Sequence, residues 1–269
     1  MLIDRQQIAR AIASKLREHS GSLHSQWLTS KPIRHFYLDD LLPAADVTKL
    51  SNSFPSPEKL LHRSTLRERK SVGIEVERYD PCIAEYLFAF QEPEVVSSIA
   101  EITNLSDLEA DPTLYASGIS MMIQGDFLNP HIDNSHDGDA ERYRVVNLLY
   151  YVSPDWQLSD GGNLELWNAG VTEPHTILSR FNRLVVMETD QLSWHSVSKV
   201  LADRARLCVS NYYFSRSATC GTDYSNVTTF TGRPEEPFRR IILNLDGYAR
   251  NALGKAFPEL RHRTKHRIK

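Results

Sequence analysis

The sequence predicts a mainly β core with flanking helices, of the α+β class. Short apolar segments rich in β-branched and aromatic residues recur through the middle of the chain, and turn residues separate them. These segments lie at residues 144–152, 161–167, 184–187, 193–197 and 206–214. Strands that follow one another without helical segments between them indicate a sandwich or barrel, not alternating strand–helix units.

The segments before this series predict helices and supporting strands. A strand is expected at residues 33–38, and residues 20–30 are expected to be a linker. The densely charged residues 61–78 predict a loop or edge hairpin at the mouth of a site, with a solvated face as the alternative. Apolar residues at helical spacing and a proline stop predict four helices before the series, at residues 4–18, 44–54, 83–90 and 94–102.

Two histidines and one aspartate have the pattern of a metal site. His131 and Asp133 are two residues apart, so on a strand both side chains point to the same side. His195 follows in another predicted strand. Two histidines and one carboxylate on one side of an iron leave the opposite positions open, as in non-haem Fe(II) oxygenases. Three further residues of ligand type follow in a loop that is expected to be solvated: His136, Asp137 and Asp139.

A polar strand face near the end of the series suggests an anion site. Arg206, Cys208, Ser210 and Tyr212 share one face of the strand at residues 206–214. A guanidinium suits a bidentate bond to a carboxylate and stays charged at any working pH. Arg204 has the same parity and is the alternative anchor, and a surface-facing edge strand is the alternative interpretation of the whole face.

Between residues 115 and 215 the chain resembles the prolyl-hydroxylase-like branch of the Fe(II)/2-oxoglutarate dioxygenases. The resemblance implies a double-stranded β-helix, the jelly roll shared with cupins, with helices packed on one sheet. The runs that carry it are GDFLNPHIDN (125–134), NLLYYVSPDW (147–156), GGNLELW (161–167), SWHSV (193–197) and RLCVSNYYF (206–214).

The resemblance also implies residue roles, which fall into three groups. The implied iron ligands are His131, Asp133 and His195; the implied co-substrate residues are Arg206, Tyr151, Leu164, Val197 and Ser210; the candidate substrate residues are Tyr212, Asn147 and Arg69. The spacing between His195 and Arg206 is slightly longer than in the hypoxia-sensing members of the family, which keeps Arg204 open as the anchor.

The implied activity is hydroxylation of an unactivated C–H bond. Fe(II) would be the bound cofactor, 2-oxoglutarate and O2 would be consumed, and succinate and CO2 would be released. Ascorbate is a candidate reductant. A carboxylate at position 133 favours hydroxylation over halogenation, because related halogenases have a small residue there. We expect a small-molecule substrate slightly ahead of a peptidyl, proline-like one. The alternatives are a non-oxidative cupin-like metal enzyme and a metal-containing binding module.

Composition narrows the partners and the compartment. A net charge of −3 is not the positive charge that is typical of nucleic-acid-binding proteins. No apolar run is long enough to cross a membrane. Three cysteines without C-x-x-C spacing suggest free thiols in a reducing compartment, the cytoplasm. The sequence does not indicate the oligomeric state.

We expect one catalytic domain over residues 1–269. It comprises N-terminal helices and supporting strands (1–110), the double-stranded β-helix (111–216) and a C-terminal helical extension (217–269). The extension contains a predicted helix at residues 236–257 and ends in a basic tail at 261–269. Such a tail can bind nucleic acid, but a solvated end is the expected state.

Overall fold

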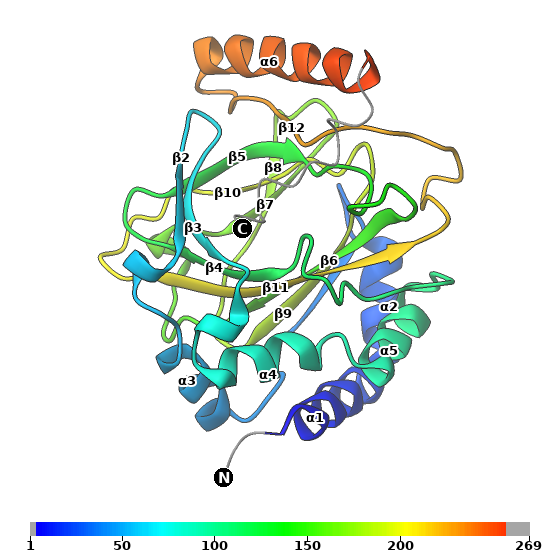
Figure 1. Cartoon of the computed structure of the whole chain (residues 1–269), viewed down its shortest axis with the longest axis vertical. Helices are drawn as coiled ribbons and strands as arrows, with labels where there is room; N and C mark the ends of the chain where they lie inside the picture. The colour runs from blue at the N-terminus through cyan, green and yellow to red at the C-terminus, as the bar shows by residue number, and fades with distance from the viewer. Residues whose placement is uncertain (1–3, 257–269) are drawn as a thin grey trace.

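The computed structural model describes residues 4–256, in which twelve antiparallel strands form one strongly curled sheet (Figure 1). The main path of the sheet is β1-β9-β6-β11-β4-β3-β5-β10-β7-β8, with β2 paired to β3 and β12 paired to β5. The strands are β1 His35–Leu38, β2 Leu61–Ser64, β3 Glu68–Gly73, β4 Gly118–Met122, β5 Phe127–Ile132, β6 Tyr143–Tyr151, β7 Leu164–Trp167, β8 Pro174–Ile177, β9 Arg183–Glu188, β10 His195–Val197, β11 Arg206–Ser215 and β12 Thr229–Phe230.

The β2–β3 hairpin joins the two halves of the curled sheet. Strand β3 pairs with β4 through Ser71 and Met121, and with β5 through Glu68 and Leu128. The sequence prediction of a mainly β core, curled as a jelly roll with flanking helices, is confirmed. The hairpin predicted within residues 61–78 is also present.

The helices lie at two ends of the molecule. Helices α1 to α5 pack against one face of the sheet, and α6 lies across the opposite end (Figure 1). The α-helices are α1 Arg5–Glu18, α2 Ser20–Thr29, α3 Ala44–Asn52, α4 Pro81–Ala89, α5 Pro93–Thr103 and α6 Pro237–Ala256, and the short 3-10 helices are η1 Pro57–Lys59, η2 Val76–Arg78 and η3 Leu158–Asp160. Within residues 4–256 no helix combines the length and the apolar character needed to cross a membrane.

Alternation along β6 separates the helical layer from the barrel interior. Leu148 and Tyr150 belong to the large apolar core under the helices, whereas Tyr151 belongs to a smaller cluster with Leu164 and Cys208. Because successive side chains of a strand point to opposite faces, one apolar strand serves both layers. From Asn147 to Tyr151 the odd-numbered residues of β6 therefore face the interior, where the predicted site lies. The pairing of β6 with β11 shifts register before Asn147, and there the even-numbered Arg144 reaches the interior.

One sequence prediction of the fold is wrong. Residues 20–30 are not a linker, because residues 20–29 form α2. Serine and glycine dominate the start of this segment, but Leu23 and Trp27 lie one helical turn apart and are completely buried. Packing of these two side chains outweighs the weak helix propensity of their neighbours. The helix predicted at 236–257 is present as α6, and the basic tail at 261–269 lies outside the described residues.

Candidate metal centre and co-substrate pocket

The three predicted ligands converge at one end of the barrel interior. His131 on β5 and His195 on β10 are directly paired across the two strands, and Asp133 follows β5. The Nε2 atoms of His131 and His195 each lie 3.7 Å from a carboxylate oxygen of Asp133. One potential ligand atom from each of the three residues lies within 4.8 Å of the other two. These distances suit donors that share one ion.

The backbone fixes which nitrogen of each histidine faces the centre. Nδ1 of His131 is 3.0 Å from the carbonyl oxygen of Asn129, and Nδ1 of His195 is 2.9 Å from that of Ser193. A carbonyl can only accept, so we assign the proton to Nδ1 and the lone pair to Nε2. Both lone pairs are then available on the side of Asp133, as a metal requires.

The protonation states also suit a divalent cation. Burial, followed by the neighbouring His195, lowers the pKa of His131 to about 3. Burial alone would raise the pKa of Asp133, but Arg144 and the two histidines hold it well below its usual range. Near neutral pH His131 is therefore neutral and Asp133 ionised, so a metal need not displace protons from these two groups. The residues present fit Fe(II).

The low pKa of His131 predicts how the metal-free protein responds to acid. An unfolded chain would take up this proton near pH 6.5, and the folded protein only near 3. Protonation of His131 therefore does not reduce the free energy of unfolding above pH 6.5. This free energy is expected to decrease as the pH falls from 6.5 towards 3, because the unfolded chain binds the proton more readily. Urea unfolding between pH 7 and 4 checks this. His131→Gln should show a shallower dependence and His19→Gln, at a partly exposed histidine, the wild-type one; equal slopes for all three proteins would contradict the prediction.

Three side chains hold the Asp133 carboxylate in place. The Tyr212 hydroxyl donates to Oδ2 at 3.1 Å, and Asn147 Nδ2 donates to the Tyr212 oxygen at 3.0 Å. Arg144 Nη1 lies 3.4 Å from Oδ1, and its guanidinium lies 4.4 Å from the centre of the Tyr212 ring. Tyr212 and Asn147, predicted as substrate residues, thus lie beside the metal centre. Sequence reasoning missed Arg144, although a charged residue at the start of an otherwise apolar strand signals a buried partner.

Arg206 is a buried cation on strand β11, at the opposite end of the strand from Tyr212. Its side chain is almost fully buried, and its guanidinium lies 4.8 Å from the centre of the Tyr151 ring. Nε donates to Ser179 Oγ at 3.2 Å, and Nη1 lies 3.9 Å from Met122 Sδ. Among the described residues no carboxylate pairs with it. A buried guanidinium without a counter-charge is costly, so the pocket suits an anionic ligand.

Arg204, the alternative anchor, is engaged elsewhere. Its side chain is exposed and forms an ion pair with Asp160 at the surface. It also donates to the backbone carbonyls of Pro154 and Asp155. Its charge is therefore already balanced outside the barrel.

The other predicted co-substrate residues lie along the interior near Arg206. Tyr151 is fully buried, and burial raises the pKa of its hydroxyl to about 12, so it is a neutral donor. Leu164 and Val197 are buried apolar residues, and Ser210 donates to the Gly118 carbonyl at 3.2 Å. Leu164 packs in the same small cluster as Tyr151, whereas Val197 packs in a separate cluster with Met122.

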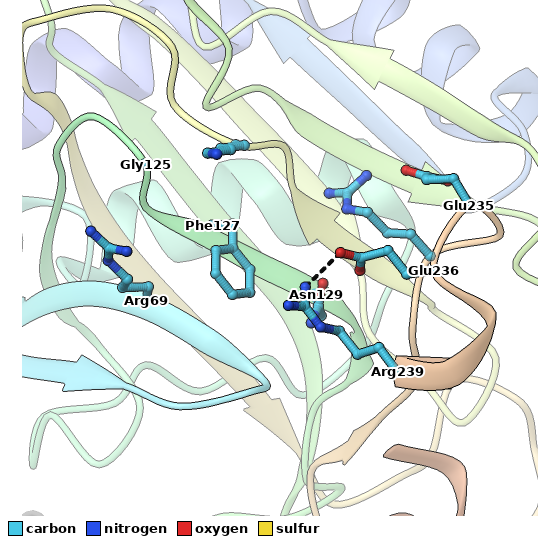
Figure 2. A pocket seen from close by; sticks show the side chains of 9 residues that line it. Arg69, Gly125, Phe127, Asn129, Glu235, Glu236 and Arg239 are labelled. Atoms are coloured by element: carbon cyan, nitrogen blue, oxygen red, sulfur yellow. Dashed lines mark hydrogen bonds and ion pairs between the residues drawn. The ribbon is translucent and has the colours of Figure 1, made fainter. Parts of the chain in front are cut away.

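Arg69, the third predicted substrate residue, lines a different pocket. It pairs with Asp126 at 3.2 Å and lines a cavity of about 410 Å³ between β5 and the start of α6 (Figure 2). None of the candidate iron ligands lines this cavity. Glu68 and Lys70, which flank Arg69 on β3, are the hairpin charges that act on His131, and they pair with each other at 3.0 Å. Adjacent residues of a strand point to opposite faces, so only one face of the hairpin can reach the site.

The loop after Asp133 is structural and only partly solvated. Asp139 is exposed, as expected, but Asp137 is buried and accepts from Arg142 Nε at 2.7 Å. Its carboxylate also accepts from the backbone of Glu141, so it closes the loop. The expectation of a solvated loop is therefore wrong for Asp137, and its bonds to the loop leave it outside the metal centre.

Comparison with known proteins agrees with this site. Residues 117–214 match the model of the 2OG-Fe(II) oxygenase superfamily. Over 84 residues the chain is 39% identical to prolyl 3-hydroxylase OGFOD1 of Xenopus laevis, a match that covers 29% of this chain and 16% of the relative. The chain thus matches only about a sixth of that relative's length.

Two solved structures have a similar fold. A Pseudomonas putida prolyl-4-hydroxylase superposes with a TM-score of 0.54 at 21% identity, covering 74% of this chain and all of the other. A Trichoplax adhaerens prolyl hydroxylase, in complex with a hypoxia-inducible-factor peptide fragment, superposes with a TM-score of 0.54 at 19% identity, covering 75% and 91%. Residues 117–214 thus match the 2OG-Fe(II) oxygenase superfamily, and the chain shares its fold with these two prolyl hydroxylases.

Proposed function

We propose that the protein is an Fe(II)- and 2-oxoglutarate-dependent dioxygenase that hydroxylates an unactivated C–H bond. One observation carries the proposal: strand β11 connects the histidine–aspartate–histidine triad, through the contact of Tyr212 with Asp133, to the buried Arg206, which has no carboxylate partner among the described residues. Fe(II) bound there would supply the O2 chemistry, with release of succinate and CO2 and with ascorbate as a reductant. Unpaired cysteines support a reducing compartment, the cytoplasm, which would keep iron ferrous.

Each part of the chain has a distinct role in this proposal. His131, Asp133 and His195 bind the metal, while Arg144 and Tyr212 keep the Asp133 carboxylate oriented. The co-substrate residues are Arg206 and Tyr151, which hold the distal carboxylate of 2-oxoglutarate, and Leu164, Val197 and Ser210, which line its pocket. A bidentate guanidinium–carboxylate bond in a buried pocket gives both affinity and orientation.

For the substrate, we favour a peptidyl proline over the small molecule that the sequence slightly favoured. Half-buried tyrosines lie along the loop after Asp133. The Tyr115 hydroxyl accepts from Asn134, next to Asp133; the Tyr143 ring lies 4.3 Å from that of His136 in this loop and 5.4 Å from that of Tyr224. Aromatic surfaces of this kind suit proline-rich, extended peptides. The relatives named above are prolyl hydroxylases, which supports the same choice.

Anaerobic titration of the metal-free protein with Fe(II) and then 2-oxoglutarate tests the cofactor pair. A visible charge-transfer band that needs both additions is expected. A protein that retains Zn²⁺ tightly and shows no band would instead favour a non-oxidative cupin-like enzyme or a binding module. Proline-containing peptides should then stimulate succinate release and gain one oxygen atom by mass, whereas matched alanine peptides should not.

A further inference from the structure

Helix α6 has its polar side turned towards the domain and its apolar side turned away. Arg240 donates to the Gly170 and Val171 carbonyls, and Asp246 pairs with Arg67 of the β2–β3 hairpin. Leu243 is the buried apolar residue on this inner side. Amphipathic helices normally bury the apolar face, so the opposite arrangement indicates that the outer face has a partner of its own.

The outer face of α6 carries five large apolar side chains, which are between 52 and 83% exposed. In Figure 1 α6 lies at the end of the molecule opposite α1 to α5, and among residues 4–256 no other helix or strand lies over its outer side. Steps of three and four residues separate most of the side chains, which is the spacing of a helix–helix contact. We call this surface the α6 strip; it consists of Phe238, Ile241, Ile242, Leu245 and Tyr248.

The order of residues in the strip is self-complementary. Phe238 and Tyr248 each lie five residues from Leu243, and Ile241 and Leu245 each lie two residues from it. Two antiparallel copies related by a two-fold axis at this point would place Phe238 against Tyr248 and Ile241 against Leu245, with Ile242 beside the axis and opposite Asn244. Such an isologous contact closes after two subunits.

We propose that the α6 strip is the interface of a homodimer in which the α6 helices of two copies pack antiparallel. The five side chains expose on the order of 600 Å² per copy if each aromatic side chain can bury about 200 Å², and a stable interface needs about 800 Å² per partner. The strip therefore supplies most of the required area.

A membrane surface is a poorer partner for the strip. Interfacial helices carry cationic side chains that flank the apolar face. Here Arg239 pairs with Glu236, and Arg240 binds backbone carbonyls of the domain. Both arginines are thus engaged on the protein side, so the strip lacks a free cationic rim there.

Sedimentation velocity over micromolar concentrations tests the dimer. The wild type should form dimers, and Leu245→Glu should be monomeric with unchanged circular dichroism and melting temperature. Leu28→Glu, at a similarly exposed leucine of α2, should remain dimeric. A monomeric wild type, or a Leu245→Glu protein that still dimerises, would overturn the proposal. Binding of a monomeric wild type to anionic vesicles, lost in Leu245→Glu, would overturn it in favour of a membrane.

Cross-linking tests the orientation without charged substitutions. In a Cys220→Ser background, which removes the exposed thiol, a short bismaleimide should join Phe238→Cys to Tyr248→Cys when the two variants are mixed. Neither variant should cross-link with itself. Self-links without mixed links would show a parallel pair, and no links at all would show that the strip is not the interface; both results contradict the proposal.

Discussion

Replacing Asp133 with alanine is expected to abolish iron-dependent turnover of 2-oxoglutarate and also to destabilise the fold. Losing a residue that merely supports a ligand costs about 10–100-fold in metal affinity or activity, and the loss of a ligand itself should exceed this. The substitution also leaves Arg144, which is buried, without its carboxylate. Removing one partner of a buried pair costs about 3–5 kcal/mol. Succinate release, Fe(II) affinity and urea unfolding of the metal-free protein measure the effects separately.

Asp137→Ala is the matched control for Asp133→Ala. It also removes a buried carboxylate from an arginine, Arg142, but outside the metal centre. It should lose stability and keep Fe(II) affinity. Equal loss of Fe(II) binding in both variants would mean that general damage to the loop, and not a missing ligand, explains the result.

Replacing Arg206 with alanine is expected to weaken 2-oxoglutarate binding by on the order of a hundredfold or more, since truncating a buried charge pair costs about 2–5 kcal/mol. Without 2-oxoglutarate the same variant should be at least as stable as the wild type, because the buried guanidinium has no acid partner among the described residues. The two readouts together identify an anion anchor, whereas a structural arginine would lose stability in both states. Anaerobic titration and thermal melts with and without 2-oxoglutarate measure these changes.

Arg204→Ala tests the alternative anchor. Arg204 binds Asp160 and carbonyls at the surface, so its removal should leave the affinity for 2-oxoglutarate close to that of the wild type. A larger loss of affinity in Arg204→Ala than in Arg206→Ala would assign the anchor to Arg204. Arg206→Lys should retain part of the affinity, because lysine keeps the charge but not the planar fork.

The grouping of the three candidate ligands could be predicted from sequence because two of them obey local rules. His131 and Asp133 share a strand face by parity alone, and neither requires knowledge of the distant chain. The third candidate ligand, His195, could be proposed because it lies in a segment whose composition predicts a strand. The pairing of β5 with β10 brings it opposite His131.

Contacts that depend on the closure of the sheet could not be predicted. Arg144 meets Asp133 only because β6, β11 and the turn after β5 come together, and Tyr212 completes the contact from β11. On the hairpin, composition drew attention to Arg69, but alternation on β3 directs Arg69 to the other pocket and its neighbours Glu68 and Lys70 towards His131. The single-domain organisation over residues 1–269 stays a prediction.

Strand β11 has a consequence for which oxo acids the protein could accept. It carries Arg206 near one end and Tyr212, which contacts Asp133, towards the other, and it is paired on both sides by β4 and β6. If the proposed roles hold, the separation between the two ends of a bound diacid is set by backbone that cannot easily stretch. Diacids one methylene shorter or longer would then bind more weakly by about 1–3 kcal/mol. Preference for a five-carbon diacid would thus be a property of the sheet itself, and side-chain substitutions in the pocket would change affinity more readily than preferred length.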